Sequence, residues 1–205
     1  MSNPTRIVVL LIFAGFLAAC AVPQSGTVAV SPPLPPAKPK LGVPAEPWLL
    51  VDAKADTLTV MKGNRTLEVF DNIALGIRGA GIKHQRGDEI TPVGTFRVGW
   101  VNPRSRFKLF FGLDYPNREY ADRAYQQGRI NTATYSRIIN ALEQGKTPPQ
   151  NTPLGGQIGI HGVGAGDPEV HEYFNWTAGC IALDNAQIER LAKWVRIGTQ
   201  VKIRG

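Results

Sequence analysis

A proline-dense stretch near the N-terminus limits where this chain can fold. Residues 31–47 have the sequence SPPLPPAKPKLGVPAEP and show no apolar periodicity. Proline lacks a backbone N–H and fixes its own φ, so such a stretch forms an extended tether more readily than a packed element. The sequence therefore predicts one domain in residues 48–205, a length that is sufficient for a single hydrophobic core.

The residues before the tether have the features of an export signal. Arg6 precedes an uncharged apolar run, residues 7–19, which is too short to span a bilayer and ends in small residues. Residues 17–20, Leu-Ala-Ala-Cys, resemble the lipobox of bacterial lipoproteins. The resemblance implies cleavage before Cys20 and a lipid on Cys20 that anchors the protein in a membrane. An ordinary secretory signal, with Cys20 incidental, is the alternative.

These N-terminal features give an expected layout and location. We expect a signal peptide in residues 1–19, a lipidated Cys20 with its tether in residues 20–47, and a location in the periplasm or cell envelope. The residue after Cys20 is Ala21 and not the aspartate that often retains lipoproteins in the inner membrane, which favours the outer membrane.

One cysteine, Cys180, remains after that processing, so no intramolecular disulfide can form. A single thiol in an oxidising compartment is either buried and inert or used in chemistry. The formal net charge is +7, and arginines and lysines are spread through residues 78–129. For an exported protein this charge favours an anionic envelope polymer or lipid headgroup over nucleic acid as a partner.

Hydrophobic patterns predict a mainly β domain with peripheral helices. The expected strands are residues 48–52, a hairpin over 57–70, 72–76, 94–101, 156–162 and 199–203. Two helices are expected between residues 119 and 145, the second capped by Asn131, and another over 183–198. Asp184 and Gln187 have the spacing of a capping box for this last helix.

Cys180 and His161 form the candidate catalytic pair. His161 ends the predicted strand GQIGIHG, and Cys180 follows it by 19 positions. A cysteine nucleophile needs a base to take its proton and N–H donors for the oxyanion, and the small residues Ala178 and Gly179 leave room for both substrate and donors. No histidine follows Cys180, which argues against papain-like peptidases, where the cysteine comes first.

Three segments resemble the bacterial L,D-transpeptidases. In chain order they are GDEITPVGTFRV, then NPRSRFKLFFGLDYPN, and last IHG followed after a loop by TAGCIALDN. The likeness runs from about Trp48 to Ile203. The resemblance implies a β-sandwich-like catalytic domain that performs acyl transfer on peptidoglycan stem peptides. It implies no metal and no organic cofactor.

The resemblance also assigns roles to residues. Cys180 attacks the carbonyl of the third stem residue, usually meso-diaminopimelate, and expels D-alanine, while His161 moves the protons. The backbone N–H of Gly179, together with that of Cys180, is the implied oxyanion donor, and the carbonyl of Gly162 helps to position the imidazole. The expected substrate-binding residues are Thr177, Trp176, Arg78 and Lys83.

Two departures from the family pattern leave questions open. Many members have histidine where this chain has Ala178, and arginine where it has Ala182. Another cation must then bind a substrate carboxylate, with Arg78, Lys83 and Arg118 as candidates. His171 is expected to be a structural or surface residue.

Two other functions remain possible from the sequence. One is hydrolysis, by an L,D-carboxypeptidase or an amidase that cleaves the murein stem or the murein–lipoprotein bond. In this class, as in transfer, an envelope lipoprotein is a possible substrate or acceptor. The other is a peptidoglycan-binding lipoprotein without catalysis, which would keep the fold and the basic surface but would not require Cys180 with His161.

Overall fold

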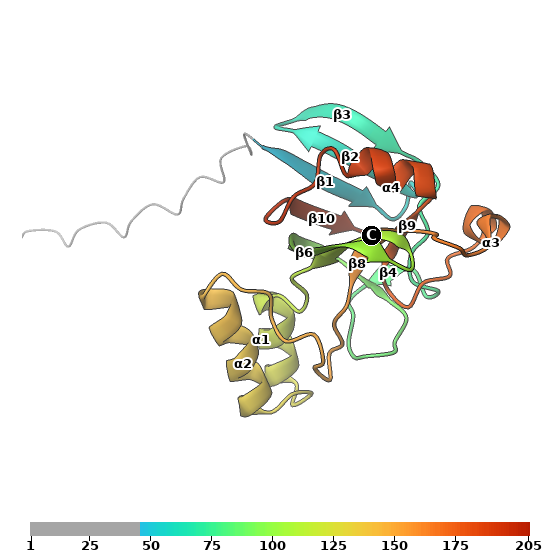
Figure 1. The fold of residues 1–205 in the computed structure, drawn as a ribbon. Helices are drawn as coiled ribbons and strands as arrows, with labels where there is room; N and C mark the ends of the chain where they lie inside the picture. The colour runs from blue at the N-terminus through green and yellow to red at the C-terminus, as the bar shows by residue number, and fades with distance from the viewer. Residues whose placement is uncertain (1–45) are drawn as a thin grey trace, which may run out of the picture. The chain divides into compact units, whose positions relative to one another are not determined.

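The structure is a computed structural model that describes residues 46–205 (Figure 1). The expected signal peptide, Cys20 and nearly all of the tether lie outside the described residues. In the part of the chain that is described, no helix is long and apolar enough to cross a membrane.

Eight strands form one mixed sheet in the order β3-β2-β1-β10-β6-β7-β8-β9. Their bounds are β1 Pro47–Asp52, β2 Thr57–Lys62, β3 Arg65–Phe70, β6 Gly94–Ser105, β7 Lys108–Leu113, β8 Gly159–Gly162, β9 Ile181–Leu183 and β10 Gln200–Arg204. Most neighbours are antiparallel, but β1 with β10 and β8 with β9 are parallel. A separate parallel pair joins β4 (Ala80–Gly81) to β5 (Thr91–Pro92).

Alternating apolar residues build the core of this sheet. In each of four neighbouring strands, two residues spaced by two positions are buried: Leu49 and Val51, Leu58 and Val60, Phe96 and Val98, and Val201 and Ile203. Because side chains alternate along a strand, one face of these strands packs inward while the other is more exposed. The expected mainly β domain is confirmed.

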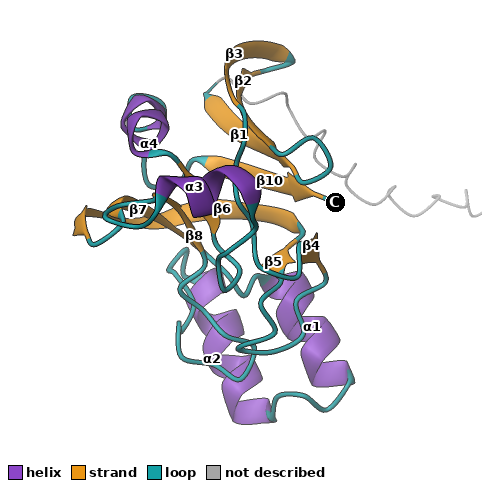
Figure 2. Ribbon diagram, turned by 90° about the vertical axis from the view of Figure 1, so that its right-hand side faces the viewer, coloured by secondary structure: helices purple, strands orange, loops and turns teal. Residues whose placement is uncertain are grey.

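Two capped helices pack against each other beside the sheet (Figure 2). They are α1 (Arg118–Gln126) and α2 (Thr132–Glu143), and the side chains of Asn117 and Asn131 accept from their first-turn N–H groups. Each cap satisfies a backbone donor that the helix leaves free, as the sequence predicted at Asn131. The pair has its own small core, which includes Ala124 and Ile138.

Two shorter helices flank the strands that carry the candidate pair. The helix α3 (Pro168–Tyr173) lies in the connection from β8 to β9, and α4 (Asn185–Leu191) packs on β7 and β8. The predicted capping box of Asp184 and Gln187 is present at α4. The helix ends at Leu191, seven residues before its predicted end. Trp194 lies in the turn that follows, and its indole N–H donates to the Glu68 carboxylate at 2.6 Å.

Candidate active site

Adjacent parallel strands place Cys180 and His161 on one face of the sheet. His161 in β8 is the register partner of Ala182 in β9, and Cys180 precedes Ala182 by two residues, directly before β9 begins. Residues two apart point to the same side of an extended chain, so the thiol and the imidazole share a face.

The imidazole of His161 is fixed in one orientation and one tautomer. Its Nδ1 lies 2.7 Å from the Gly162 carbonyl oxygen, which can only accept, so Nδ1 carries the proton and Nε2 presents its lone pair. The ring stacks on Phe107 at 4.3 Å and on Phe110 at 5.8 Å, and meets the edge of Trp176 at 5.8 Å. This aromatic enclosure holds Nε2 ready to accept a proton.

The same burial keeps His161 neutral. Burial lowers the pKa of His161 below its usual range, and the hydrogen bond to the Gly162 carbonyl opposes this shift only in part. The positive charge of Arg106 lowers the pKa further. A neutral imidazole is the form that acts as a general base.

Cys180 is half-buried, and its thiol points toward backbone groups. Sγ donates to the Gln157 carbonyl oxygen at 3.4 Å, and between residues 46 and 205 no hydrogen bond joins it to His161. Burial raises the pKa of Cys180 to about 11, and the backbone of Gly159 and the charge of Lys83 offset only part of this. The resting pair is therefore a neutral thiol beside a neutral imidazole, not a thiolate–imidazolium ion pair.

A tight turn over residues 177–180 carries Cys180. The Thr177 hydroxyl donates to the Cys180 carbonyl oxygen at 2.8 Å and accepts from the Gly179 N–H at 3.1 Å. Gly179 has φ +125°, and a Cβ there would lie 2.7 Å from the Ile90 carbonyl oxygen, so this position requires glycine. Within the described chain the Cys180 N–H has no acceptor, whereas the Gly179 N–H is occupied by Thr177. Of these two backbone donors, the Cys180 N–H is thus the one left free.

Thr91 holds this turn from the opposite side, a role that we did not predict for it. Its buried hydroxyl accepts from the Gly76 N–H at 2.8 Å and lies 3.4 Å from the Cys180 carbonyl oxygen, to which it donates. Thr91 belongs to the segment GDEITPVGTFRV, one of the three that resemble the L,D-transpeptidases. This resemblance was the sequence signal from which a role for Thr91 in the site could have been predicted.

The three side chains expected to bind a substrate carboxylate, Lys83, Arg118 and Arg78, have different surroundings. Lys83 is 2% exposed and forms an ion pair with the buried Asp88, so its charge is already neutralised. The Arg118 side chain pairs with Glu143 at 2.9 Å across α1 and α2. Arg78 is exposed, and its backbone N–H donates to the Glu89 carbonyl oxygen.

The other residues near the pair define the walls of the site. Trp176 lines a cavity and donates from Nε1 to His171 Nδ1 at 3.3 Å. His171 is buried, and its Nε2 has no hydrogen-bond partner in the described residues. Ala182, where many family members have arginine, is fully buried opposite His161 and leaves no room for a long side chain. Across residues 46–205 no group of three histidine, cysteine or acidic side chains is placed to hold a metal ion.

Comparison with protein-family models identifies the domain. Residues 46–203 match the model YkuD, described as the L,D-transpeptidase catalytic domain. The chain belongs to this family. Among curated proteins no match was found.

Two solved structures illustrate what this domain is similar to. The helical cell shape determining protein Pgp2 from Campylobacter jejuni is 26% identical, with a TM-score of 0.53 over 78% of this chain and 47% of that chain. An L,D-transpeptidase from Mycobacterium smegmatis is 16% identical, with a TM-score of 0.41 over 78% of this chain and 59% of that chain. The chain therefore spans about half the length of Pgp2.

Proposed function

We propose that this protein is a murein L,D-transpeptidase in which Cys180 is the nucleophile and His161 is the general base. One observation carries the proposal: the Gly162 carbonyl fixes His161 with a free Nε2 lone pair, on the strand next to Cys180. A buried structural histidine would not need this arrangement next to a half-buried cysteine. Membership of the L,D-transpeptidase catalytic domain family supports the same assignment.

The first half-reaction forms a thioester. Cys180 Sγ attacks the carbonyl carbon of the third stem residue while its proton passes to His161 Nε2. The oxyanion is received by the Cys180 N–H, and by the Gly179 N–H once the Thr177 hydroxyl releases it. The C–N bond then breaks, and His161 returns the proton to the amine of the departing D-alanine.

The second half-reaction transfers the acyl group. An acceptor amine attacks the thioester carbon and gives a proton to His161. The C–S bond breaks, and this proton returns to Sγ, so the enzyme is regenerated without net change. Water in place of the amine would give hydrolysis, with a free carboxylate as product.

Intact mass of the protein after mixing with tetrapeptide muropeptides tests the proposal. We expect release of D-alanine and a thioester adduct on the protein that is absent in Cys180→Ala. Cross-linked products indicate transfer, whereas tripeptides alone indicate hydrolysis. Peptide binding with no D-alanine release and no adduct would contradict catalysis and favour a binding lipoprotein.

The location remains part of the proposal. A lipid on Cys20 would hold the domain at the envelope membrane, close to its polymer substrate. Palmitate labelling of the protein in cells, lost in Cys20→Ser, is the expected result, and equal labelling of both would refute it. Because Pgp2 is described as a helical cell shape determining protein, we further propose that loss of this protein alters cell shape.

A further inference from the structure

His171 is a buried histidine to which the proposed reaction gives no part. It lies in α3 and is 6% exposed, and its Nδ1 is 3.3 Å from the indole Nε1 of Trp176. An indole N–H can only donate, so Nδ1 accepts and the neutral ring carries its proton on Nε2. That Nε2 has no hydrogen-bond partner in the described residues. The side chain therefore buries an N–H without an acceptor, which destabilises a fold.

The contact with Trp176 requires the neutral form of His171. A protonated ring would carry a second N–H on Nδ1, directed at the indole N–H, and the hydrogen bond would be lost. Burial lowers the pKa of His171 below its usual range, and the negative charge of Asp184 opposes this shift only in part. At pH 8 the ring is thus neutral, and its Nδ1 is an acceptor.

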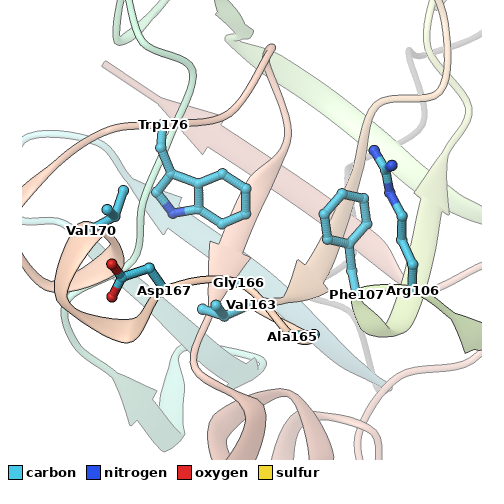
Figure 3. A pocket seen from close by; sticks show the side chains of 8 residues that line it. All are labelled: Arg106, Phe107, Val163, Ala165, Gly166, Asp167, Val170 and Trp176. Carbon is cyan, nitrogen blue, oxygen red and sulfur yellow. The ribbon is translucent and has the colours of Figure 1, made fainter.

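Trp176 lies between His171 and His161. The centroid of its ring is 6.5 Å from that of His171 and 5.8 Å from that of His161, and both contacts are edge-to-face. Figure 3 shows the indole extending into the cavity of about 470 Å³ that Phe107 also lines. Because the indole adjoins open space, packing alone does not fix the ring, and the hydrogen bond to His171 supplies the missing restraint.

The orientation of this indole matters to His161. The Gly162 carbonyl holds the imidazole at Nδ1, and Phe107 stacks on its ring at 4.3 Å. Trp176 covers a further part of the same ring. A turn of the indole into the cavity would remove this wall, so that water would reach the imidazole and the imidazole would swing about its bond to Cβ.

We propose that His171 is a positioning residue for the general base, and that it acts by holding the Trp176 indole against His161. The inference rests on the proposed function, because its main consequence is the rate of D-alanine release. It also explains why an imidazole with an unpaired Nε2 occupies this buried position: the ring is there for the acceptor at Nδ1.

Two substitutions of His171 separate positioning from packing. His171→Leu has a similar volume but no acceptor, whereas the side-chain oxygen of His171→Asn takes the place of Nδ1. At pH 8 the kcat of D-alanine release should fall about ten-fold in His171→Leu, because a displaced base loses its productive geometry. His171→Asn should restore most of this rate. The control is His84→Leu, which replaces an exposed histidine outside this contact and should leave the rate unchanged.

Stability distinguishes this role from a purely structural one. His171→Leu removes a buried N–H that has no acceptor, and the indole N–H that it releases belongs to the half-buried Trp176, where water can replace the lost partner. The urea midpoint of unfolding should therefore stay the same or rise while kcat falls. A parallel fall of the midpoint and of kcat would show a structural histidine and overturn the inference.

A double-mutant cycle tests the route through the indole. Trp176→Phe keeps an aromatic ring beside His161 but has no N–H for His171 to accept. In this background His171→Leu and His171→Asn should have equal kcat, because no contact remains for either substitution to change. A difference between them as large as in the wild-type background would mean that His171 acts by another route, and the inference would be wrong.

Solvent exchange of the Trp176 indole N–H gives a measurement that does not depend on activity. NMR identifies this proton by its absence in Trp176→Phe, and its exchange should be faster in His171→Leu and unchanged in His171→Asn. Equal exchange in His171→Leu and the wild type would overturn the inference whatever the activity. The expected exchange pattern with no D-alanine release by the wild type would instead refute the proposed function and leave the contact established.

Discussion

The protonation state of the proposed catalytic pair, Cys180 and His161, gives the sharpest prediction. With a pKa of about 11, Cys180 is thiolate in about one molecule in 10,000 at pH 7, against about 3% for a free cysteine of pKa 8.5. A thiolate of higher pKa is more nucleophilic, which recovers about ten-fold of this roughly 300-fold deficit. Alkylation of Cys180 by iodoacetamide at pH 7 should therefore be at least about 20-fold slower than that of free cysteine.

The pH dependence provides a test that does not depend on access to the thiol. Between pH 6 and pH 9 the alkylation rate should rise about ten-fold for each pH unit without levelling, because this range lies far below the thiol pKa. Mass spectrometry of the labelled protein at several times gives the rate. A plateau that begins below pH 8 would show a thiolate–imidazolium pair and refute the reasoning.

Replacing His161 separates resting reactivity from catalysis. In His161→Gln the alkylation rate should stay within about two-fold, since the neutral imidazole does not ionise the resting thiol, while D-alanine release should fall by about 100- to 10,000-fold. Circular dichroism confirms that the variant is folded. A parallel loss of both rates would contradict a general-base role that operates only during attack.

The same pair sets the acid limit of activity. His161 must be neutral to accept the thiol proton, and burial holds its pKa below 6.5. The acid limb of kcat/KM should accordingly have its midpoint below pH 6.5, and activity should be lost only as the pH falls through that lower value. A midpoint above pH 6.5 would show that substrate-free His161 is not desolvated.

Three further predictions concern the support of the site. Lys83→Met should destabilise the fold by about 1.5–3 kcal/mol in urea unfolding, because Asp88 loses its charged partner and keeps only backbone N–H donors such as those of His84 and Gln85; no measurable loss would argue against the ion pair. Thr91→Val should lower the free energy of unfolding by about 1–3 kcal/mol and reduce D-alanine release, because the Gly76 N–H and the Cys180 carbonyl each lose a partner. Thr91→Ser keeps the hydroxyl and should retain most of the stability and of the activity. Gly179→Ala should abolish activity because the added Cβ would collide with the Ile90 backbone. The control is Gly198→Ala, which is also at positive φ but has open space around it, and this variant should stay active with only a modest loss of stability. Comparable activity in the two glycine variants would contradict the geometry of the turn.

The sequence predicted elements whose signals are local. The hairpin β2–β3, the cap at Asn131 and the capping box at Asp184 all depend on residues within a few positions of one another. Cys180 and His161 were proposed as a pair from a motif, and the structure places His161 in β8 and Cys180 directly before the adjacent strand β9.

Features that depend on distant segments were not predictable in the same way. The strand β7 was missed because Leu109, Phe110 and Phe111 are consecutive apolar residues without alternation, and its register with β6 shifts between Asn102 and Ser105. Lys83 occurs in a charged stretch typical of a surface loop, and only the fold brings it beside Asp88 in the interior. The end of α4 at Leu191 was also not predicted, and the turn that follows it makes a tertiary contact from Trp194 to Glu68.

The parallel pairing of β8 and β9 has a consequence for how this domain could change over time. Parallel neighbours need a long return connection, and here it carries α3 and Trp176. Hydrogen bonds hold this connection near both of its ends. Gly164 exchanges two backbone hydrogen bonds with the Asn185 side chain, and the Asn175 side chain accepts from the Leu75 N–H. Substitutions between these two points leave the hydrogen bonds between β8 and β9 intact. They can therefore reshape the cavity that this connection lines without moving the strands that position Cys180 and His161.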